Sequence, residues 1–407
     1  MTNSNSQINL SFINKIKSAL SSNIPSKESN ERYQSKLITG DFNDLHDLNI
    51  AYVLKGFPTL SQTFVLNELK YLIENNYNVV VFCYKDPMDS VELDFDLEVV
   101  RFDSPELSDD LTANLEELLL RYEIDLMHTH FVYPPCTEFT FPVAEKMGIP
   151  FTVFGHAVDI FKYDVEKINR VDEITCSDYC KAIFTLSQYH KNHLISRGVP
   201  EDKIVITRQA TDYEIHDLEF NEREVKNIIS ISRFVDKKGI DVLIDAAKIL
   251  EDEDFEFSIY GFGKLEKKYK KQISDLGLEN ISVKGLLNGP KEVQDVFSKS
   301  DILVSPCRIS KNGDRDGIPT VIFEAMAYGV TVLTTSVSAI PEVIEDGKNG
   351  FIVEAENPEE LALKIKEIAK LSNEERFEIA KQAQIDVQNL SSVENTMNTV
   401  LNTWGSN

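Results

Sequence analysis

The sequence has few cysteines, little positive charge and no long apolar segment. Its five cysteines are scattered over 407 residues. The one close pair, Cys176 and Cys180, does not have zinc-finger spacing, so we expect reduced thiols rather than disulfides or a zinc cluster. Lysine and arginine number 42 against 67 acidic residues, and the net charge of −25 argues against nucleic acid as a partner. The longest clean apolar run is short, at about residues 79–83, so no segment is predicted to span a bilayer.

The N-terminal segment lacks a basic stretch followed by an apolar core, which is the pattern of a secretory signal. We therefore expect a cytoplasmic protein. Residues 1–44 are rich in serine and asparagine and are interpreted as a leader that is flexible or packs locally. Within residues 10–20, one helical face is apolar: Phe12, Ile13, Ile16, Ala19 and Leu20. A weak contact with the inner face of a membrane is therefore a second interpretation of this leader.

From residue 48 onward, short apolar runs alternate with amphipathic helical patterns. The predicted strands of the first half are residues 49–54, 79–84, 98–102, 125–128, 150–154, 181–186 and 203–207. After a polar, irregular stretch at 209–223, the predicted strands are residues 228–232, 256–260, 281–283, 302–305, 331–334 and 351–353. This alternation is typical of α/β proteins with parallel sheets. We expect two Rossmann-like lobes, at residues 45–215 and 216–390, and a final helix within residues 391–407.

Two cations in the second half are placed where an anion would bind. Ligands of doubly wound sheets lie beyond the carboxyl ends of the strands, so we expect the site in the cleft between the lobes. Arg233 directly follows a predicted strand, and Lys238 precedes a helix that begins near Gly239. Positive side chains at a helix N-terminus favour a group such as a diphosphate, which arginine can grip with two hydrogen bonds. The alternative is an ordinary charged loop.

A neighbouring strand end carries Gly261 and Gly263. They form the G-x-G part of a dinucleotide fingerprint without its third glycine, so no NAD site is predicted. A tight turn and a loop that approaches a ligand both fit this pair.

Two acids surround the start of another helix. Asp316 lies before it, Pro319 suits its first turn, and Glu324 falls in the second turn within an apolar run. A buried carboxylate is costly unless it is hydrogen-bonded, and two acids separated by seven residues can accept from the hydroxyls of one extended ligand. The alternative is structural, with one acid favouring the helix dipole and the other bonded to backbone.

These residues carry a resemblance to a known family. The run D-G-I-P-T-V-I-F-E-A-M-A-Y-G, from residue 316, is similar to the signature of the retaining glycosyltransferases of family 4, often called group 1 glycosyltransferases. Arg233 with Lys238 resembles their phosphate-binding pair. In the first half, F-P-T-L-S-Q-T-F-V from residue 57 is similar to a loop of members that build surface polysaccharides. H-T-H-F from residue 128 and G-H-A-V-D-I-F from residue 155 also fit.

The resemblance implies the two-lobed glycosyltransferase B fold and the transfer of a sugar, with retention of configuration, from a nucleotide diphosphate sugar to a hydroxyl. The acceptor would be a carbohydrate or a lipid-linked molecule bound by the first lobe, in polysaccharide or glycolipid synthesis. The implied donor-binding residues are Arg233, Lys238, Gly263, Asp316, Gly317, Ile318, Thr320 and Glu324. The implied catalytic residues are His156, Arg233, Lys238 and Asp316, and the implied acceptor-side loop contains Gly56, Ser61 and Thr63. Glu324 would bind the ribose, Asp316 the sugar, and the two cations the leaving diphosphate.

One departure from the family pattern concerns the donor. The signature usually begins with glutamate, and Asp316 is shorter by one methylene, which puts the donor's identity in question. Two alternatives to a transferase are a non-catalytic nucleotide-sugar-binding subunit and a two-lobed epimerase or oxidoreductase.

No metal ion or other cofactor is expected. The D-x-D matches that begin at Asp94 and Asp314 are expected by chance in so acidic a chain. His128 and His130 occupy alternating strand positions, and we expect them to point in opposite directions and to share no metal.

Overall fold

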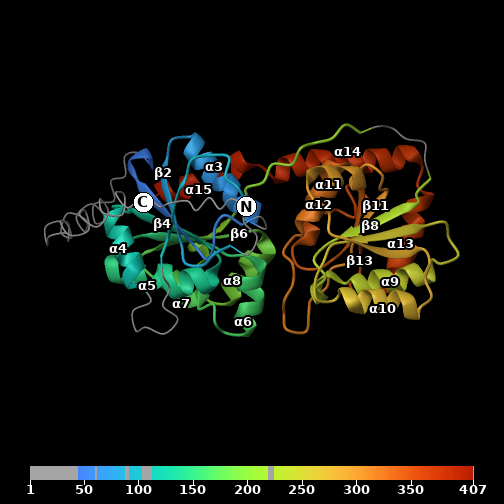
Figure 1. Ribbon diagram of the computed structural model, residues 1–407, viewed down its shortest axis with the longest axis horizontal. Coiled ribbons are helices and arrows are strands. Elements are labelled where there is room, and N and C mark those ends of the chain that lie inside the picture. The colour runs from blue at the N-terminus through green and yellow to red at the C-terminus, as the bar shows by residue number, and fades with distance from the viewer. Residues whose placement is uncertain (1–44, 60–61, 88–90, 103–111, 219–223, 407) are drawn as a thin grey trace, which may run out of the picture.

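The computed structural model describes residues 45–59, 62–87, 91–102, 112–218 and 224–406. These residues form two lobes side by side, each with a parallel sheet between two layers of helices (Figure 1). The leader at 1–44, with its apolar face, and Ser61 lie outside the described residues. Within the described part of the chain, no helix is both long enough and apolar enough to cross a membrane.

The first sheet has seven parallel strands in the order β3-β2-β1-β4-β5-β6-β7. Their bounds are β1 Asn49–Leu54, β2 Asn78–Cys83, β3 Glu98–Arg101, β4 Leu126–His130, β5 Phe151–Phe154, β6 Cys180–Thr185 and β7 Ile204–Ile206. The second sheet has six parallel strands in the order β10-β9-β8-β11-β12-β13. Their bounds are β8 Asn227–Ile231, β9 Glu256–Tyr260, β10 Ile281–Gly285, β11 Ile302–Ser305, β12 Thr331–Thr335 and β13 Phe351–Val353.

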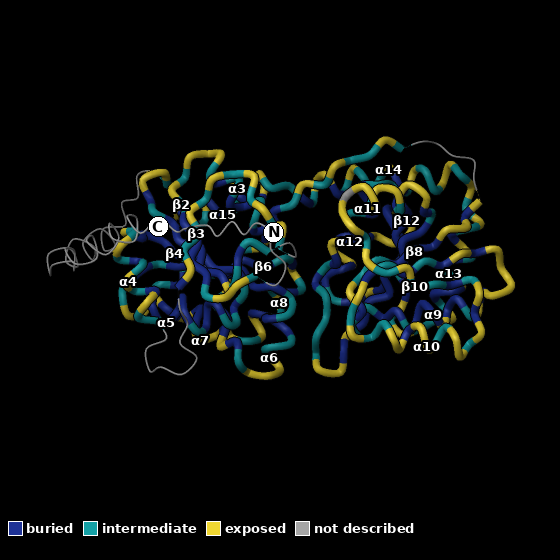
Figure 2. Tube along the Cα trace, viewed as in Figure 1, coloured by how far each residue is buried: buried dark blue, intermediate teal, exposed yellow. Residues whose placement is uncertain are grey.

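Helices cover both faces of each sheet. In the first lobe these are α3 Thr63–Glu74, α4 Ala113–Arg121, α5 Phe141–Met147, α6 Tyr163–Val165, α7 Val171–Cys176, α8 Gln188–Ser196 and the π-helical segments Val132–Thr140 and Val158–Lys162. In the second they are α9 Ile240–Ile249, α10 Glu266–Asp275, α11 Pro290–Phe297, α12 Thr320–Ala327, α13 Pro358–Lys370 and α14 Asn373–Leu390. Each sheet has a buried apolar cluster on either side, and the buried residues gather inside the two lobes (Figure 2). Because both faces are covered, central strands such as β1 and β11 are buried along nearly their whole length and read as apolar runs.

The final helix, α15 (Val393–Gly405), returns from the second lobe to pack on the first (Figure 1). Its apolar face joins the core under α3 through Met397, Val400 and Trp404. Trp404 is 1% exposed, and its Nε1–H donates to Thr152 Oγ1 of β5 at 3.0 Å. A buried indole needs such an acceptor, so the bond fixes where the helix lies.

The fold class predicted from the sequence is confirmed: the protein has two doubly wound parallel sheets. The strand order reverses direction between β1 and β4 in the first lobe and between β8 and β11 in the second. Loops that follow the two central strands diverge there, which opens a crevice at the carboxyl edge of each sheet. We therefore expect the functional residues in the loops after β1, β4, β5, β8 and β11.

Candidate functional site

The loop after β8 carries the predicted cations. Arg233 is exposed, and its side chain makes no ion pair or hydrogen bond with any residue that the structure describes. Phe234 anchors the loop in the core, and a single 3₁₀ turn, Asp236–Lys238, leads to Gly239 at the N-cap of α9. Gly239 has a φ of +63°, and a Cβ there would lie 1.9 Å from the carbonyl oxygen of Pro306. The loops that follow β8 and β11 therefore press against each other at the switch point of the second sheet.

Lys238 is held by the loop after β11. Its Nζ lies 2.7 Å from Asp316 Oδ2, and Nζ of the adjacent Lys237 lies 3.2 Å from Asp316 Oδ1 and 2.9 Å from Asp314 Oδ1. Burial alone would raise the pKa of Asp316, but the two ammonium groups lower it to about 2. Burial would likewise lower the pKa of Lys238, and the attraction of Asp316 raises it instead. Asp316 and Lys238 are therefore both charged at neutral pH.

The rest of the predicted signature forms the start of α12. Gly317 is buried and Ile318 half-buried, Pro319 is the N-cap in extended conformation, and Thr320 is the first helical residue and is exposed. The first N–H groups of a helix have no acceptor within it, and this turn begins four residues after Asp316, the partner of Lys238, so it is a suitable place for an anion. Pro319 therefore precedes the helix by one residue instead of lying in its first turn.

Glu324 lies in the second turn of α12 and is half-buried. Burial raises its pKa, and among the described residues no donor reaches its carboxylate. Burial raises the pKa of the Tyr213 and Tyr328 phenols. The charge of the nearby Glu324 raises both further. A buried carboxylate without donors is costly unless a ligand provides them.

Gly263, in the loop after β9, approaches the chain itself. Its φ is +148°, and a Cβ there would lie 2.7 Å from the carbonyl oxygen of Phe234. The neighbouring Phe262 accepts a hydrogen bond from the Phe234 N–H at 2.6 Å. The glycine thus allows the loops after β8 and β9 to lie against each other, which supports the tight-turn interpretation and sets the position of Arg233.

The acceptor-side loop follows β1 in the first lobe. Gly56 packs against the loop after β2, since a Cβ there would lie 3.1 Å from the carbonyl oxygen of Lys85. Thr59 Oγ1 donates to the Gly56 carbonyl at 3.2 Å, and Thr63 is the exposed first residue of α3. Gly56 and Thr63 therefore lie at the switch point of the first sheet.

His156 follows β5 and is 5% exposed. Its backbone N–H donates to Asp159 Oδ1 at 2.8 Å, and the other carboxylate oxygen of Asp159 accepts from the N–H of Val132. Its ring Nε2 lies 3.1 Å from Nδ1 of His130, and its Nδ1 lies 3.5 Å from Nε2 of Gln209. Burial, followed by the proximity of His130 and His190, lowers the pKa of His156 well below its usual value, so the ring is neutral.

The expectation that His128 and His130 point in opposite directions is wrong. Residues two apart on a strand share a face, because it is successive side chains that alternate. Both histidines face Glu68 of α3: Nε2 of His130 lies 3.0 Å and Nε2 of His128 3.9 Å from Glu68 Oε2. The three side chains are fully buried and place ligand atoms within 4.8 Å of one another, so they are the described residues best arranged to hold a metal ion.

The two lobes meet beside these loops. Gly317 packs on the buried His190 of α8, whose Cε1 would lie 2.9 Å from a Cβ at that glycine. The Glu342 carboxylate of the second lobe accepts the N–H groups of Gln188 and Tyr189, at 3.0 and 2.8 Å, and so caps α8 from the other lobe. Arg315 donates to the Tyr189 hydroxyl at 2.8 Å. A small cavity of about 20 Å³ between the lobes is lined by Gln209, Tyr213, Ile318 and Phe323, among others.

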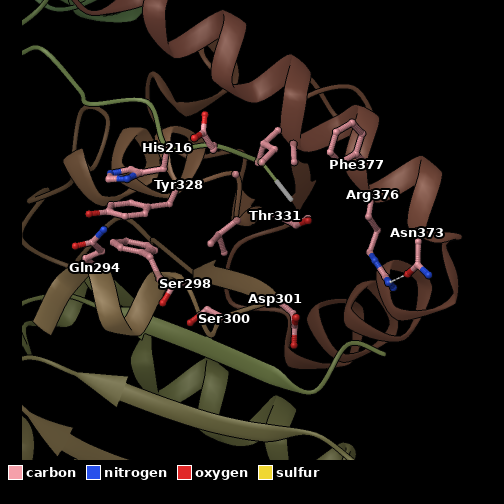
Figure 3. Close-up of a pocket in the computed structure, with 16 residues that line it drawn as sticks. His216, Gln294, Ser298, Ser300, Asp301, Tyr328, Thr331, Asn373, Arg376 and Phe377 are labelled. Carbon is pink, nitrogen blue, oxygen red and sulfur yellow. Dashed lines mark hydrogen bonds between the residues drawn. The ribbon is translucent and has the colours of Figure 1, made fainter. Parts of the chain in front are cut away.

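A second, larger cavity of about 490 Å³ lies elsewhere (Figure 3). It is lined by Asp301 and Thr331, which lie at the amino ends of β11 and β12, and by the stacked rings of His216 and Tyr328, 3.9 Å apart. Its position is at the opposite edge of the sheet from Lys238. We therefore assign the chemistry to the smaller inter-lobe crevice.

Sequence reasoning missed several residues of the site. Glu68 interrupts the buried face of α3, where the other buried residues are Phe64, Val65, Leu69 and Leu72, and an acid inside an apolar stripe is a recognisable signal. Asp159, Lys237 and Gln209 carry no such signal. Each contacts a residue that is far away in the chain: Val132, Asp314 and His156, respectively.

Comparisons with known proteins agree with this geometry. Residues 61–214 match the family model described as glycosyltransferase family 4, and residues 214–386 match that of the glycosyl transferases group 1. The amylovoran biosynthesis glycosyltransferase AmsK of Erwinia amylovora is 25% identical over 363 residues, which are 77% of this chain and 89% of that one. The uncharacterized glycosyltransferase MJ1178 of Methanocaldococcus jannaschii is 30% identical over 265 residues, 62% of this chain and 67% of that one.

Solved structures show the same architecture. Anabaena HepE in complex with UDP and glucose matches with a TM-score of 0.71 at 17% identity, over 88% of this chain and 100% of that chain. At that identity the likeness concerns the fold. Two matched family models, a 30% identical relative and the doubly wound lobes lead to one conclusion: the chain belongs to the group 1 glycosyltransferases of family 4 and has their two-lobed glycosyltransferase B fold.

Proposed function

We propose that this glycosyltransferase moves a sugar from a nucleotide diphosphate sugar to a hydroxyl of a carbohydrate or lipid-linked acceptor, with retention of configuration and without a metal ion. The observation that carries the proposal is the pair Arg233 and Lys238 at the switch point of the second lobe, beside the first turn of α12. Two relatives give the substrate class: AmsK is named for amylovoran biosynthesis, and HepE was solved with UDP and glucose. Such relatives favour a catalytic protein over a non-catalytic binding subunit.

Each residue then has a role that its surroundings support. The diphosphate replaces Asp316 as the ion-pair partner of Lys238 and also pairs with Arg233. These two cations then stabilise the negative charge that develops on the leaving group. Glu324, without donors of its own, accepts the ribose hydroxyls. Asp316 accepts the sugar hydroxyls, and His156 approaches the sugar from the first lobe.

The charges already present support the proposed metal independence. Lys237 and Lys238 occupy the carboxylates of Asp314 and Asp316, so a divalent cation at this D-x-D match would have to displace two ammonium groups. The other match is no better placed, since Asp94 is paired with Lys70 at 2.6 Å on the surface. Fixed cations at the crevice can supply the charge that a metal provides elsewhere.

A panel of nucleotide sugars, assayed for hydrolysis and for transfer to sugar acceptors, tests the proposal. We expect turnover of at least one donor, and a product whose anomeric proton coupling matches that of the donor. Tight donor binding with no turnover of any kind would favour the non-catalytic subunit. An inverted product would contradict retention and leave the transferase assignment intact.

A further inference from the structure

A line of buried polar groups runs from the first lobe's core to His156. Tyr52 of β1 donates its hydroxyl to Glu68 Oε2 at 3.1 Å, and Nε2 of His130 lies 3.0 Å from the same oxygen. Nδ1 of His130 lies 3.1 Å from Nε2 of His156. Tyr52, Glu68 and His130 are fully buried, and the four residues come from β1, α3, β4 and the loop after β5. The line therefore ends in the crevice loop to which the sequence resemblance assigns a catalytic histidine.

The direction of the hydrogen bonds along this line depends on Glu68, whose pKa burial raises to about 7. Above that pH the carboxylate can only accept hydrogen bonds. Burial raises the pKa of Tyr52 well above its usual value, so the phenol keeps its proton and donates to Glu68. Burial lowers the pKa of His130 to about 3, so this ring is neutral and carries one proton. Because Nε2 of His130 faces the accepting oxygen of Glu68, that proton belongs on Nε2. Its Nδ1 must then accept, and the donor is the Nε2–H of His156.

We propose that Glu68 and His130 are positioning residues that hold His156 in the neutral tautomer protonated at Nε2, so that its Nδ1 is the acceptor presented to a hydroxyl of the donor sugar. Nδ1 of His156 faces the amide of Gln209, a residue that lines the small cavity between the lobes. The proposal rests on the proposed function, because it assigns a hydrogen-bonding role to the ring that meets the sugar. It follows the logic by which an acid fixes the tautomer of a catalytic histidine in hydrolytic triads.

The geometry also provides a matched control. His128 lies on the same strand and face as His130 and is equally buried, but its Nδ1 is bonded to Thr152 Oγ1 at 2.8 Å and it does not touch His156. Thr152 in turn accepts from Trp404, so His128 belongs to the attachment of α15. Replacing either histidine should disturb the packing, whereas only replacing His130 should change the tautomer of His156.

NMR spectroscopy of the full chain, labelled with ¹⁵N-histidine, tests the proposal. The seven histidines are assigned by single substitutions, and two-bond proton–nitrogen correlations identify the protonated nitrogen of each ring. At pH 8.5, above the pKa of Glu68, we expect His156 to carry its proton on Nε2 in the unmodified protein. A proton on Nδ1 would overturn the proposal, and this result does not depend on finding a donor or an acceptor.

Variants connect the tautomer to turnover. His130→Leu should give His156 a mixture of tautomers and lower kcat by roughly tenfold with KM nearly unchanged, which is the loss expected for one hydrogen bond at the transition state. His128→Leu removes equal bulk but leaves the contact between His130 and His156 in place, so it should keep the tautomer and lower kcat less than His130→Leu. His130→Asn should restore much of kcat, because its amide oxygen can accept from the Nε2–H. Equal loss of kcat in both leucine variants would show a structural role only and overturn the proposal.

A bound metal is the rival arrangement and gives a distinct outcome. An ion held by Glu68, His128 and His130 would bind Nε2 of His130, move its proton to Nδ1 and leave His156 protonated on Nδ1. About one metal ion per chain in the purified protein, together with that tautomer, would contradict our assignment. If instead the tautomer is as proposed and His156→Ala keeps full activity, the role of His156 at the sugar fails while the relay stands.

Discussion

At the scale of single residues, the site is organised around one shared carboxylate. Asp316 binds both Lys237 and Lys238, so the cation assigned to the diphosphate already has a protein partner. An incoming diphosphate would exchange one anion for another at Lys238, while Arg233 gains its first partner among the described residues. The shorter side chain of aspartate, in place of the usual glutamate, fits this ion pair, and it also sets how far a sugar hydroxyl must reach.

This exchange predicts opposite effects for the two acids on nucleotide binding. Asp316→Asn should bind the free nucleoside diphosphate at least as tightly as the unmodified protein, because Lys238 loses its competing carboxylate, yet turnover should fall. Glu324→Gln should weaken binding about tenfold, since a charged acceptor for the ribose is lost. Titration calorimetry measures both, with the exposed Glu345→Gln as the control. Lost binding in Asp316→Asn with full binding in Glu324→Gln would reverse the two roles.

At the scale of elements, the crevice depends on three strand-end loops that interlock. Gly263 lets the loop after β9 lie on Phe234, and Gly239 lets the loop after β8 lie on Pro306. These contacts leave Lys238 directly before α9 and beside Asp316. Two glycines therefore set the position of Lys238, the lysine that we propose binds the diphosphate.

Gly239 and Gly277 give a matched test of this arrangement. Their φ angles are +63° and +64°, but a Cβ at Gly277 meets no atom within 4 Å, whereas one at Gly239 would strike Pro306. Gly277→Ala should cost about 1 kcal/mol of unfolding free energy from the left-handed backbone alone. Gly239→Ala should cost about 1–3 kcal/mol more through overpacking and should also lower kcat, because Lys238 shifts. Denaturant unfolding measures the stability of the two variants, and initial rates measure their kcat. Equal stability and equal kcat in the two variants would contradict the interlocking of the loops.

Most strands and helices could be predicted from the local sequence pattern. The exceptions depend on contacts between residues that are distant in the chain. Strands β1, β9, β11 and β13 form at the predicted residues, because three of them are mostly apolar runs and β9 alternates apolar and polar residues. Strand β4 was predicted at 125–128 but runs from Leu126 to His130. Its last two residues are polar and are satisfied only in the folded protein, where Thr129 donates to Val53 and His130 meets Glu68.

The same limit applies to the candidate site. Arg233 and Lys238 could be predicted because a cation directly after a strand and before a helix has a fixed place in a doubly wound sheet. The contact between Glu68 and His130 joins residues 62 apart in the chain, and no local pattern pairs them. The pairing of Lys238 with Asp316 likewise depends on two loops meeting at a switch point.

At the scale of the whole molecule, the two lobes are joined by polar contacts and by the returning helix. Glu342 caps α8 across the crevice, and Arg315 reaches Tyr189, whereas α15 buries Trp404 in the first lobe. Polar contacts of this kind exchange with water at little cost, while the buried helix does not. We therefore expect the lobes to separate and close around the donor with α15 fixed to the first lobe.

The central claim is that fixed protein charges, and no metal, stabilise the departing diphosphate. The most direct measurement is the initial transfer rate of the unmodified protein and of Lys238→Ala, each with excess chelator and again after manganese or magnesium is added back. Lys299→Ala, on the exposed far edge of the second sheet, serves as the charge control. The account predicts that chelation changes the rate little, that Lys238→Ala lowers it on the order of 100- to 1000-fold with the fold intact, and that metal does not rescue it. Loss of transfer on chelation with recovery on add-back, or an unchanged rate in folded Lys238→Ala, would contradict it.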